Sequence, residues 1–334
     1  MAMPDPDPMK PADLAAHRPP AWLRGGHLQT LWPAVIAPRA QVALRRERWT
    51  TPDADFIEVD RIDSPAGTRA PLVVLFHGLE GNSDSPYARS LMAAVAERGW
   101  RGAVPHFRGC GSELNAAPRA YHSGDSDEID WILRRFAAEP HAGSAPLFAA
   151  GVSLGGNALL KWLGERNRAA AFVKAAAAVC APQDLQAGAE ALAQGFSLLY
   201  TRNFLKTLKR KSLAKLAQYP GLFDRDRMVG ARDFFDFDDA VTAPMHGFAS
   251  CYDYWTRSSS RRFLADIHIP TRVLNALNDP FVPPRALATP AEVSPWVQLH
   301  YPEHGGHVGF HAAGAWGRSR WLADYLLDYF DAHR

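Results

Sequence analysis

One pentapeptide restricts the possible folds of this chain more than any other stretch. The sequence GVSLG at 151–155 lies between a short apolar run, 147–150, and a segment, 157–166, whose leucines recur at helical spacing. The run predicts a buried strand and the spacing predicts a helix. A serine on so tight a turn has a strained backbone, and side chains at the two flanking positions would collide, which explains both glycines. The turn would lift the Ser153 hydroxyl out of the sheet, next to a helix N-terminus that favours negative charge.

The motif G-x-S-x-G is a modest signal by itself. Glycine and serine are common in turns, and an ordinary corner between a strand and a helix would carry the same letters. The context that the motif requires, a strand before it and a helix after it, is present here. A catalytic interpretation therefore depends on whether a base, an acid and an oxyanion site occur elsewhere in the chain.

Composition limits the class of protein. The 334 residues are 47% hydrophobic and 22% charged, as in a soluble globular protein, and a net charge of +2 gives no attraction for nucleic acid. No apolar run approaches the roughly 20 residues of a membrane span. Residues 1–20 are rich in proline and aspartate, lack the apolar core of a signal peptide, and are expected to form a disordered leader. Cys110, Cys180 and Cys251 are too few and too scattered for a disulfide framework or a zinc site, and suit a reducing cytoplasm.

Alternating strand and helix patterns predict an α/β fold with a doubly wound, mostly parallel sheet of eight strands. An antiparallel hairpin is expected at the sheet edge from 41–49 and 56–61, and a strand covered on both faces from the apolar run 71–77. Further strands are expected at 102–105, 147–150, 171–180, 271–277 and 296–300, and helices at 85–98, 126–138, 157–166 and 314–331. The core would comprise 21–182 and 263–334, with a helical lid inserted at 183–262.

Two loops after the insertion supply the partners that a nucleophilic serine needs. A serine hydroxyl attacks only when a base takes its proton and an acid orients that base. Asp279 lies just past one predicted strand, and His307 lies in a glycine-flanked loop after the next. The order serine, acid, histidine is that of α/β-hydrolases, and all three would meet at the carboxyl ends of the strands. The pattern predicts a catalytic triad of Ser153, Asp279 and His307.

An oxyanion hole requires two backbone N–H groups aimed at the developing negative charge. One is expected from Leu154, directly after the nucleophile. The other is expected from Leu79, in the loop after the third strand, because the preceding glycine lets the chain turn inward. The predicted mechanism uses no metal and no cofactor.

Several of these residues have an alternative role. Asp279 precedes a proline and could simply form a turn. His304, His307 and His311 could bind a metal ion, although their spacing matches no common zinc signature and they lie in a glycine-rich loop. His27 could be a site residue, or a capping or core histidine. The triad is favoured because its members occur jointly, in the required order and topological positions.

Seven motifs together resemble the YheT-like esterase branch of the α/β-hydrolase superfamily, from about residue 21 to the C-terminus. They are GGHLQT at 25–30, HGLEGNS at 77–83, FRGCG at 107–111, YHSG at 121–124, GVSLGGN at 151–157, NDPF at 278–281 and GGHVGF at 305–310. The resemblance implies a serine esterase fold with Ser153, Asp279 and His307 as its triad, and eukaryotic relatives that hydrolyse lipids or acylglycerols. Some relatives carry an N-terminal membrane anchor, and no anchor is found in this sequence. His122 and Asp127 form a His-x4-Asp pattern discussed for acyltransferase activity in related hydrolases.

The predicted insertion contains a basic amphipathic stretch, 191–223, without an acidic residue. Its basic residues are Arg202, Lys206, Lys209, Arg210, Lys211 and Lys215, and its apolar residues Phe204, Leu205, Leu208, Leu213 and Leu216 fall near one helical face. Two interpretations are open: weak peripheral contact with an anionic membrane, or a solvated lid helix whose apolar face packs on the protein. Aromatic residues at 233–239 and 248–255 are expected in part to line an acyl pocket.

The predicted function is hydrolysis of small-molecule carboxylic esters, with short-to-medium-chain or lipid-like acyl groups, through an acyl-enzyme on Ser153 in the cytoplasm. One alternative is an acyltransferase or thioesterase that uses the same triad. The other is a catalytically silent binding protein that retains the hydrolase fold, although such a protein usually loses a triad residue. The sequence leaves the oligomeric state open.

Overall fold

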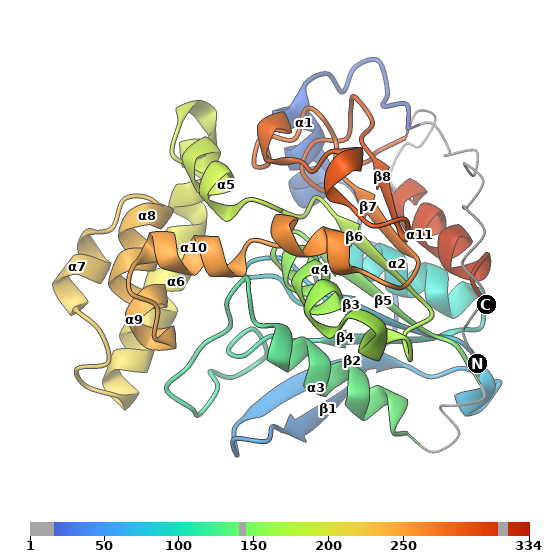
Figure 1. The fold of residues 1–334 in the computed structure, drawn as a ribbon, viewed down its shortest axis with the longest axis horizontal. Coiled ribbons are helices and arrows are strands. Elements are labelled where there is room, and N and C mark those ends of the chain that lie inside the picture. Colours follow the sequence, from blue (N-terminus) through green and yellow to red (C-terminus); the bar gives the residue numbers. More distant parts are fainter. Residues whose placement is uncertain (1–16, 140–144, 313–319) are drawn as a thin grey trace.

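The computed structural model describes residues 17–139, 145–312 and 320–334. An eight-stranded sheet with the order β1-β2-β4-β3-β5-β6-β7-β8 runs through its centre (Figure 1). Its strands are β1 Arg45–Thr50, β2 Phe56–Ile62, β3 Leu72–Phe76, β4 Arg101–Pro105, β5 Leu147–Val152, β6 Ala175–Val179, β7 Thr271–Leu274 and β8 Val297–His300. The pairs β1·β2 and β2·β4 are antiparallel and the others are parallel, which confirms the predicted fold class.

Two layers of helices enclose the sheet. Helices α2 Pro86–Glu97 and α11 Trp321–Asp331 cover one face, and α3 Ser126–Ala137 and α4 Leu154–Arg166 cover the other (Figure 1). Successive residues of β3 alternate between the two layers. Val74 belongs to the core beneath α3 and α4, and Val73 to the core beneath α2 and α11. A strand buried on both faces has no need of polar residues, which explains its continuous apolar run. The predicted start of the last helix, residue 314, lies outside the described residues.

The chain between β6 and β7 forms a helical unit beside one end of the sheet (Figure 1). Its main helices are α5 Leu185–Leu192, α6 Leu198–Gln218, α7 Arg225–Gly230, α8 Phe234–Phe237, α9 Ala243–His246 and α10 Cys251–Ser258. The unit has a small apolar core that includes Leu205, Met228 and Val241. The prediction that the leucines of α6 share one apolar face that packs on the protein is only partly correct, because Leu213 is 41% exposed.

Lys215 shows that the basic residues of α6 do not all face solvent. Its side chain is buried, and its ammonium group donates to the carbonyl oxygens of Asn115 at 2.7 Å and Ala117 at 2.8 Å. A buried ammonium group is tolerated when acceptors replace its lost water. Lys215 therefore ties the insertion to the core, a role that its position in a basic stretch did not indicate.

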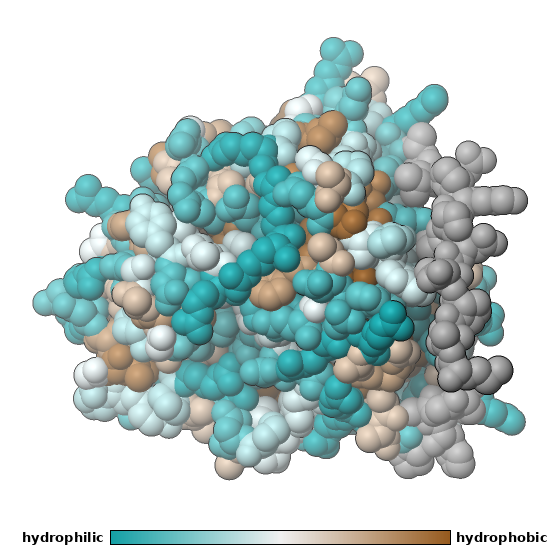
Figure 2. Space-filling view, in the orientation of Figure 1, coloured by the Kyte–Doolittle hydropathy of each residue, from teal (hydrophilic) through white to brown (hydrophobic). Residues whose placement is uncertain are grey.

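The N-terminal end of the described chain packs on the core. His17 is buried, and its ring lies edge-on to Phe310 and Trp321 with centroid distances of 5.4 and 4.9 Å. The observed packing thus begins at residue 17, within the predicted leader, and residues 1–16 lie outside the described chain. The face seen in Figure 2 is largely hydrophilic, with apolar side chains near α1 (Gly26–Leu31) and at the outer edge of the insertion. None of the described helices combines the length and apolar character needed to cross a membrane.

Candidate active site

The turn between β5 and α4 places Ser153 at the carboxyl edge of the sheet. Its φ of 52° and ψ of −120° are sterically unfavourable for a residue with a side chain. A Cβ atom on Gly151 would lie 2.5 Å from the carbonyl oxygen of Gly155, and one on Gly155 would lie 2.5 Å from that of His77. Both contacts are far too short, so both positions require glycine. Strand, turn and helix thus follow one another as the sequence predicted.

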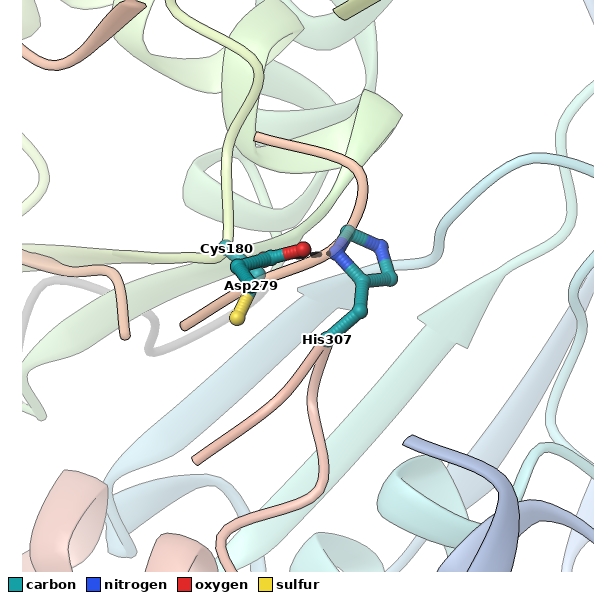
Figure 3. A group of neighbouring side chains, drawn as sticks. All are labelled: Cys180, Asp279 and His307. Carbon is teal, nitrogen blue, oxygen red and sulfur yellow. Dashed lines mark hydrogen bonds and ion pairs between the residues drawn. The ribbon is translucent and has the colours of Figure 1, made fainter. Parts of the chain in front are cut away.

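Ser153, His307 and Asp279 form a continuous chain of hydrogen bonds, referred to below as the candidate relay. The Ser153 Oγ lies 2.9 Å from His307 Nε2, and His307 Nδ1 lies 2.8 Å from Asp279 Oδ2. Figure 3 shows the carboxylate facing the imidazole. A carboxylate only accepts, so Nδ1 carries the proton and Nε2 is free to accept the serine hydroxyl. The three residues predicted from chain order therefore meet in the geometry of a nucleophile, a base and an orienting acid.

The Asp279 carboxylate is fixed from its other side. Its Oδ1 accepts the N–H groups of Phe281 at 2.8 Å and Val282 at 3.3 Å, and its side chain is fully buried. The Phe281 ring stacks on His307 with a centroid distance of 4.2 Å. Asp279 does form a turn, as the alternative interpretation expected, but the same turn aims its second oxygen at His307.

Cys180 lies beside this chain, and its Sγ, an Asp279 oxygen and a His307 nitrogen lie within 4.8 Å of one another (Figure 3). These are metal-ligand types, and no other such cluster occurs in the described part of the chain; His304 and His311 do not belong to it. The sulfur accepts the N–H of Val308 at 3.2 Å, and burial raises the pKa of the thiol well above its usual value. A neutral thiol is a poor ligand, so the donor set fits loop packing better than metal binding.

The loop that carries His307 is held by the N-terminal arm, defined here as residues 21–40. Gln29 Oε1 accepts the N–H of Gly305 at 2.8 Å and the side-chain amide of Asn278 at 2.9 Å. Thr30 Oγ1 accepts the N–H of His307 itself at 2.9 Å. The sequence interpretation missed both residues, although they belong to the quoted motif GGHLQT. The motif itself was the only available signal, since these contacts join residues more than 240 positions apart.

Replacing Gln29 with leucine is expected to lower the kcat of ester hydrolysis roughly 10- to 100-fold, with a much smaller change in KM. The substitution preserves most of the buried volume but leaves the Gly305 and Asn278 donors without an acceptor, at about 1–3 kcal/mol each. The His307 loop would then lose its fixed position, which matters because small displacements of catalytic groups cost rate. Steady-state kinetics and thermal unfolding of Gln29→Leu measure this. Gln186→Leu, at an exposed site on α5, is the matched control and should behave as wild type.

His77 sets the direction of the predicted oxyanion donor Leu79. The N–H of Phe107 donates to His77 Nε2 at 3.0 Å, so Nδ1 carries the proton and donates to the carbonyl oxygen of Gly78 at 2.7 Å. Burial lowers the pKa of His77 to about 3, which keeps the ring neutral. In a trans peptide the C=O and N–H groups point in opposite directions, so fixing the Gly78 carbonyl also fixes the Leu79 amide.

Both predicted oxyanion donors, Leu79 and Leu154, line the same cavity as Ser153. Leu154 is the first residue of α4, where an amide has no partner within the helix. The next residue in the chain is Glu80. Its carboxylate accepts hydrogen bonds from the Tyr121 hydroxyl at 2.9 Å and from the Lys211 ammonium group of α6 at 2.8 Å. The insertion therefore contacts the loop that presents one of the two amides.

The sequence also matches the family described as the alpha/beta hydrolase fold over residues 71–313. The chain belongs to the α/β-hydrolase family. Its relatives include "Putative esterase YheT" of Escherichia coli (strain K12), 38% identical over 313 residues that cover 92% of this chain and 91% of that protein. "Phospholipase ABHD3" of Bos taurus is 30% identical over 330 residues, covering 96% of this chain and 79% of that protein. These relatives confirm the resemblance to the YheT-like branch.

Solved structures show the same family fold. An esterase of Pyrococcus furiosus superposes with a TM-score of 0.57 at 13% identity, covering 89% of this chain and 98% of that chain. Alpha/beta hydrolase domain-containing protein 10 from mouse gives a TM-score of 0.53 at 15% identity, covering 87% and 99%. At this level of identity the likeness concerns the fold alone.

Two cavities meet at Ser153 in this member of the family. The inner cavity, about 190 Å³, lies between the core and the insertion, and its apolar lining includes Leu185, Leu208, Val241 and Met245. The outer groove, about 640 Å³, lies between the N-terminal arm, α2 and the loop after β3. Both contain Ser153, Phe281 and His307. A substrate with its carbonyl at Ser153 therefore has room on two sides.

Three other residues singled out in the sequence do not belong to this chain of hydrogen bonds. His122 lines the inner cavity, where burial lowers its pKa to about 3, and its ring lies 4.5 Å from that of His246. The Asp127 side chain is 88% exposed on α3 and pairs with Arg166 at 2.5 Å, so the His-x4-Asp pattern does not form one site. His27 lines neither cavity; its Nδ1 lies 3.3 Å from the Tyr200 hydroxyl of α6.

Proposed function

We propose that this chain hydrolyses carboxylic esters through a covalent acyl-enzyme on Ser153. The observation that carries the proposal is the hydrogen-bonded chain from Ser153 through His307 to the buried Asp279, at the junction of two cavities. His307 Nε2 would take the hydroxyl proton while Oγ attacks the carbonyl carbon. The amides of Leu79 and Leu154 would stabilise the oxyanion. His307 would then protonate the leaving oxygen and later activate the water that releases the acid.

The two cavities support an assignment of the two halves of the ester. Val308 and Gly309, directly after the proton donor His307, line only the outer groove. A leaving oxygen must lie close to His307 to receive its proton, so the alcohol part is assigned to the outer groove. The acyl chain is assigned to the apolar inner cavity, where burial of its methylene groups contributes to binding. Relatives that bear esterase and phospholipase names support this substrate class.

A cytoplasmic location belongs to the same proposal. Cys110, Cys180 and Cys251 are all free and buried. Unpaired thiols are typical of proteins kept in a reducing compartment.

A series of p-nitrophenyl esters of increasing acyl length tests the proposal. Wild-type protein is expected to turn over these esters with a preference for a short-to-medium chain. Leu208→Trp, which fills part of the inner cavity, should shift the preference to shorter chains and lower kcat/KM for longer ones about 10-fold or more. Leu213→Trp, at an exposed position of the same helix, is the control. Absence of turnover with every ester in wild-type protein would contradict the function, whereas an unchanged preference in Leu208→Trp would contradict the acyl assignment.

A further inference from the structure

Five exposed apolar side chains lie on the N-terminal arm and at the start of the insertion, two segments that help to line the outer groove; together they are called the apolar rim. They are Leu28 at 53% exposure, Val35 at 76%, Ile36 at 60%, Phe196 at 49% and Leu199 at 52%. Exposed leucine or valine is ordinary when scattered singly, but contiguous apolar surface usually marks an interaction site. The rim is therefore a candidate interaction surface.

The two parts of the rim are held against each other through His27. Leu28, Val35 and Ile36 belong to the N-terminal arm, and the other two belong to the start of the insertion. The His27 ring lies 4.7 Å from that of Phe196 and stacks on Tyr200 at 5.8 Å, which joins the arm to the insertion. Val35 and Tyr200 line the groove that ends at Ser153. The apolar rim thus lies on two segments that line the groove leading to the candidate active site.

The charge around the rim has a single sign. Neither 17–46 nor 191–223 contains an acidic residue. Arg39, Arg202 and Lys206 are exposed, and none of them takes part in an ion pair between described residues. The acidic groups that line the groove are compensated: Glu80 by Lys211, Asp84 by Arg89, and Glu97 by Arg320.

We propose that the apolar rim and its flanking cations dock this protein on an anionic lipid surface, from which amphiphilic esters enter the outer groove. An exposed apolar ring would enter the acyl boundary, and the cations would contact anionic headgroups. Because both segments of the rim also line the groove, an ester leaving the lipid layer would have a short path to Ser153. The proposal rests on ester hydrolysis as the function of the site. It differs from the sequence interpretation in that Lys211 and Lys215 of the basic helix face the core.

Vesicle flotation tests the docking directly. Wild-type protein is expected to bind phosphatidylcholine vesicles that contain phosphatidylglycerol, and to bind pure phosphatidylcholine vesicles more weakly. Ile36→Ser/Leu199→Ser should lower the partition coefficient about 10-fold or more, since two exposed apolar anchors are lost. Leu213→Ser, at another exposed leucine of α6, is the matched control and should bind as wild type. Arg202→Ser/Lys206→Ser should abolish the preference for anionic vesicles and the sensitivity of binding to salt.

A kinetic comparison separates docking from catalysis. Ile36→Ser/Leu199→Ser should hydrolyse a water-soluble p-nitrophenyl ester as wild type does, because neither residue lines a cavity. On an ester carried in anionic vesicles it should lose about 10-fold in rate. Equal vesicle binding by the rim variant and the Leu213→Ser control would overturn the proposal. A concentration-dependent dimer that the rim variant abolishes would also overturn it, in favour of a second copy. If wild-type protein did not hydrolyse the soluble ester, that result would instead contradict the proposed function.

Discussion

Replacing Ser153 with alanine is expected to lower kcat/KM for p-nitrophenyl esters by on the order of 10⁵-fold, because it removes the hydroxyl that lies within hydrogen-bond distance of the proposed base, His307. The remaining activity would come from binding and from the oxyanion amides acting on water. The fold should persist. Ser153 adopts an unfavourable φ of 52° with either side chain, and the turn is held through backbone contacts, such as the bond from Ser153 N to Val179 O at 2.8 Å.

A fluorophosphonate probe gives an independent measurement of the same prediction. The probe reacts with an activated serine, so wild-type protein should be labelled and the labelled peptide should contain Ser153. Ser153→Ala should not be labelled. Ser112→Ala, at an exposed serine of the loop after β4, should be labelled as wild type. Turnover or labelling retained in Ser153→Ala would show that another group carries the reaction.

The residues that form the candidate relay could be predicted because local patterns place them. The apolar runs gave the strands, and parallel strands bring the loops at their carboxyl ends to one edge. Asp279 and His307 needed only to follow the correct strands in the correct order. The glycines of the elbow were also predictable, since a Cβ atom at Gly151 or Gly155 would collide with backbone. The geometry among the three residues then follows from the topology.

The residues that support the relay could not be predicted in the same way. Gln29 and Thr30 contact the His307 loop across 276 or more positions, and no periodicity encodes such a contact. Lys215 belongs to a stretch whose composition suggests a solvated basic face, yet burial against carbonyl oxygens decides its position. The His-x4-Asp pattern of His122 and Asp127 did not predict a site, although these two residues are close in sequence. Only four residues separate them in sequence, but Asp127 begins the exposed face of a helix, whereas His122 precedes that helix and turns inward.

Asp279→Asn is expected to lower kcat by on the order of 10³- to 10⁴-fold, although it is almost isosteric and should leave the fold intact. The structure determines how the new amide must lie. Two backbone donors, from Phe281 and Val282, point at Oδ1, so the asparagine carbonyl has to occupy that position. Its NH₂ group then faces His307 Nδ1, 2.8 Å away. An amide NH₂ only donates, so the imidazole must accept at Nδ1 and carry its proton on Nε2.

This change of tautomer, rather than the loss of a charge alone, accounts for the size of the expected effect. With a proton on Nε2, His307 donates to the Ser153 oxygen and can no longer take the hydroxyl proton. The imidazolium that forms in the transition state also lacks its anionic partner. Nitrogen NMR of the histidine side chains measures the tautomer directly: Nδ1 should be protonated in wild-type protein and Nε2 in Asp279→Asn. Asp226→Asn, at a side chain that is 90% exposed on α7, controls for the substitution itself. Near-normal kcat together with the wild-type tautomer would mean that Asp279 is a turn former only, and that another group orients the base.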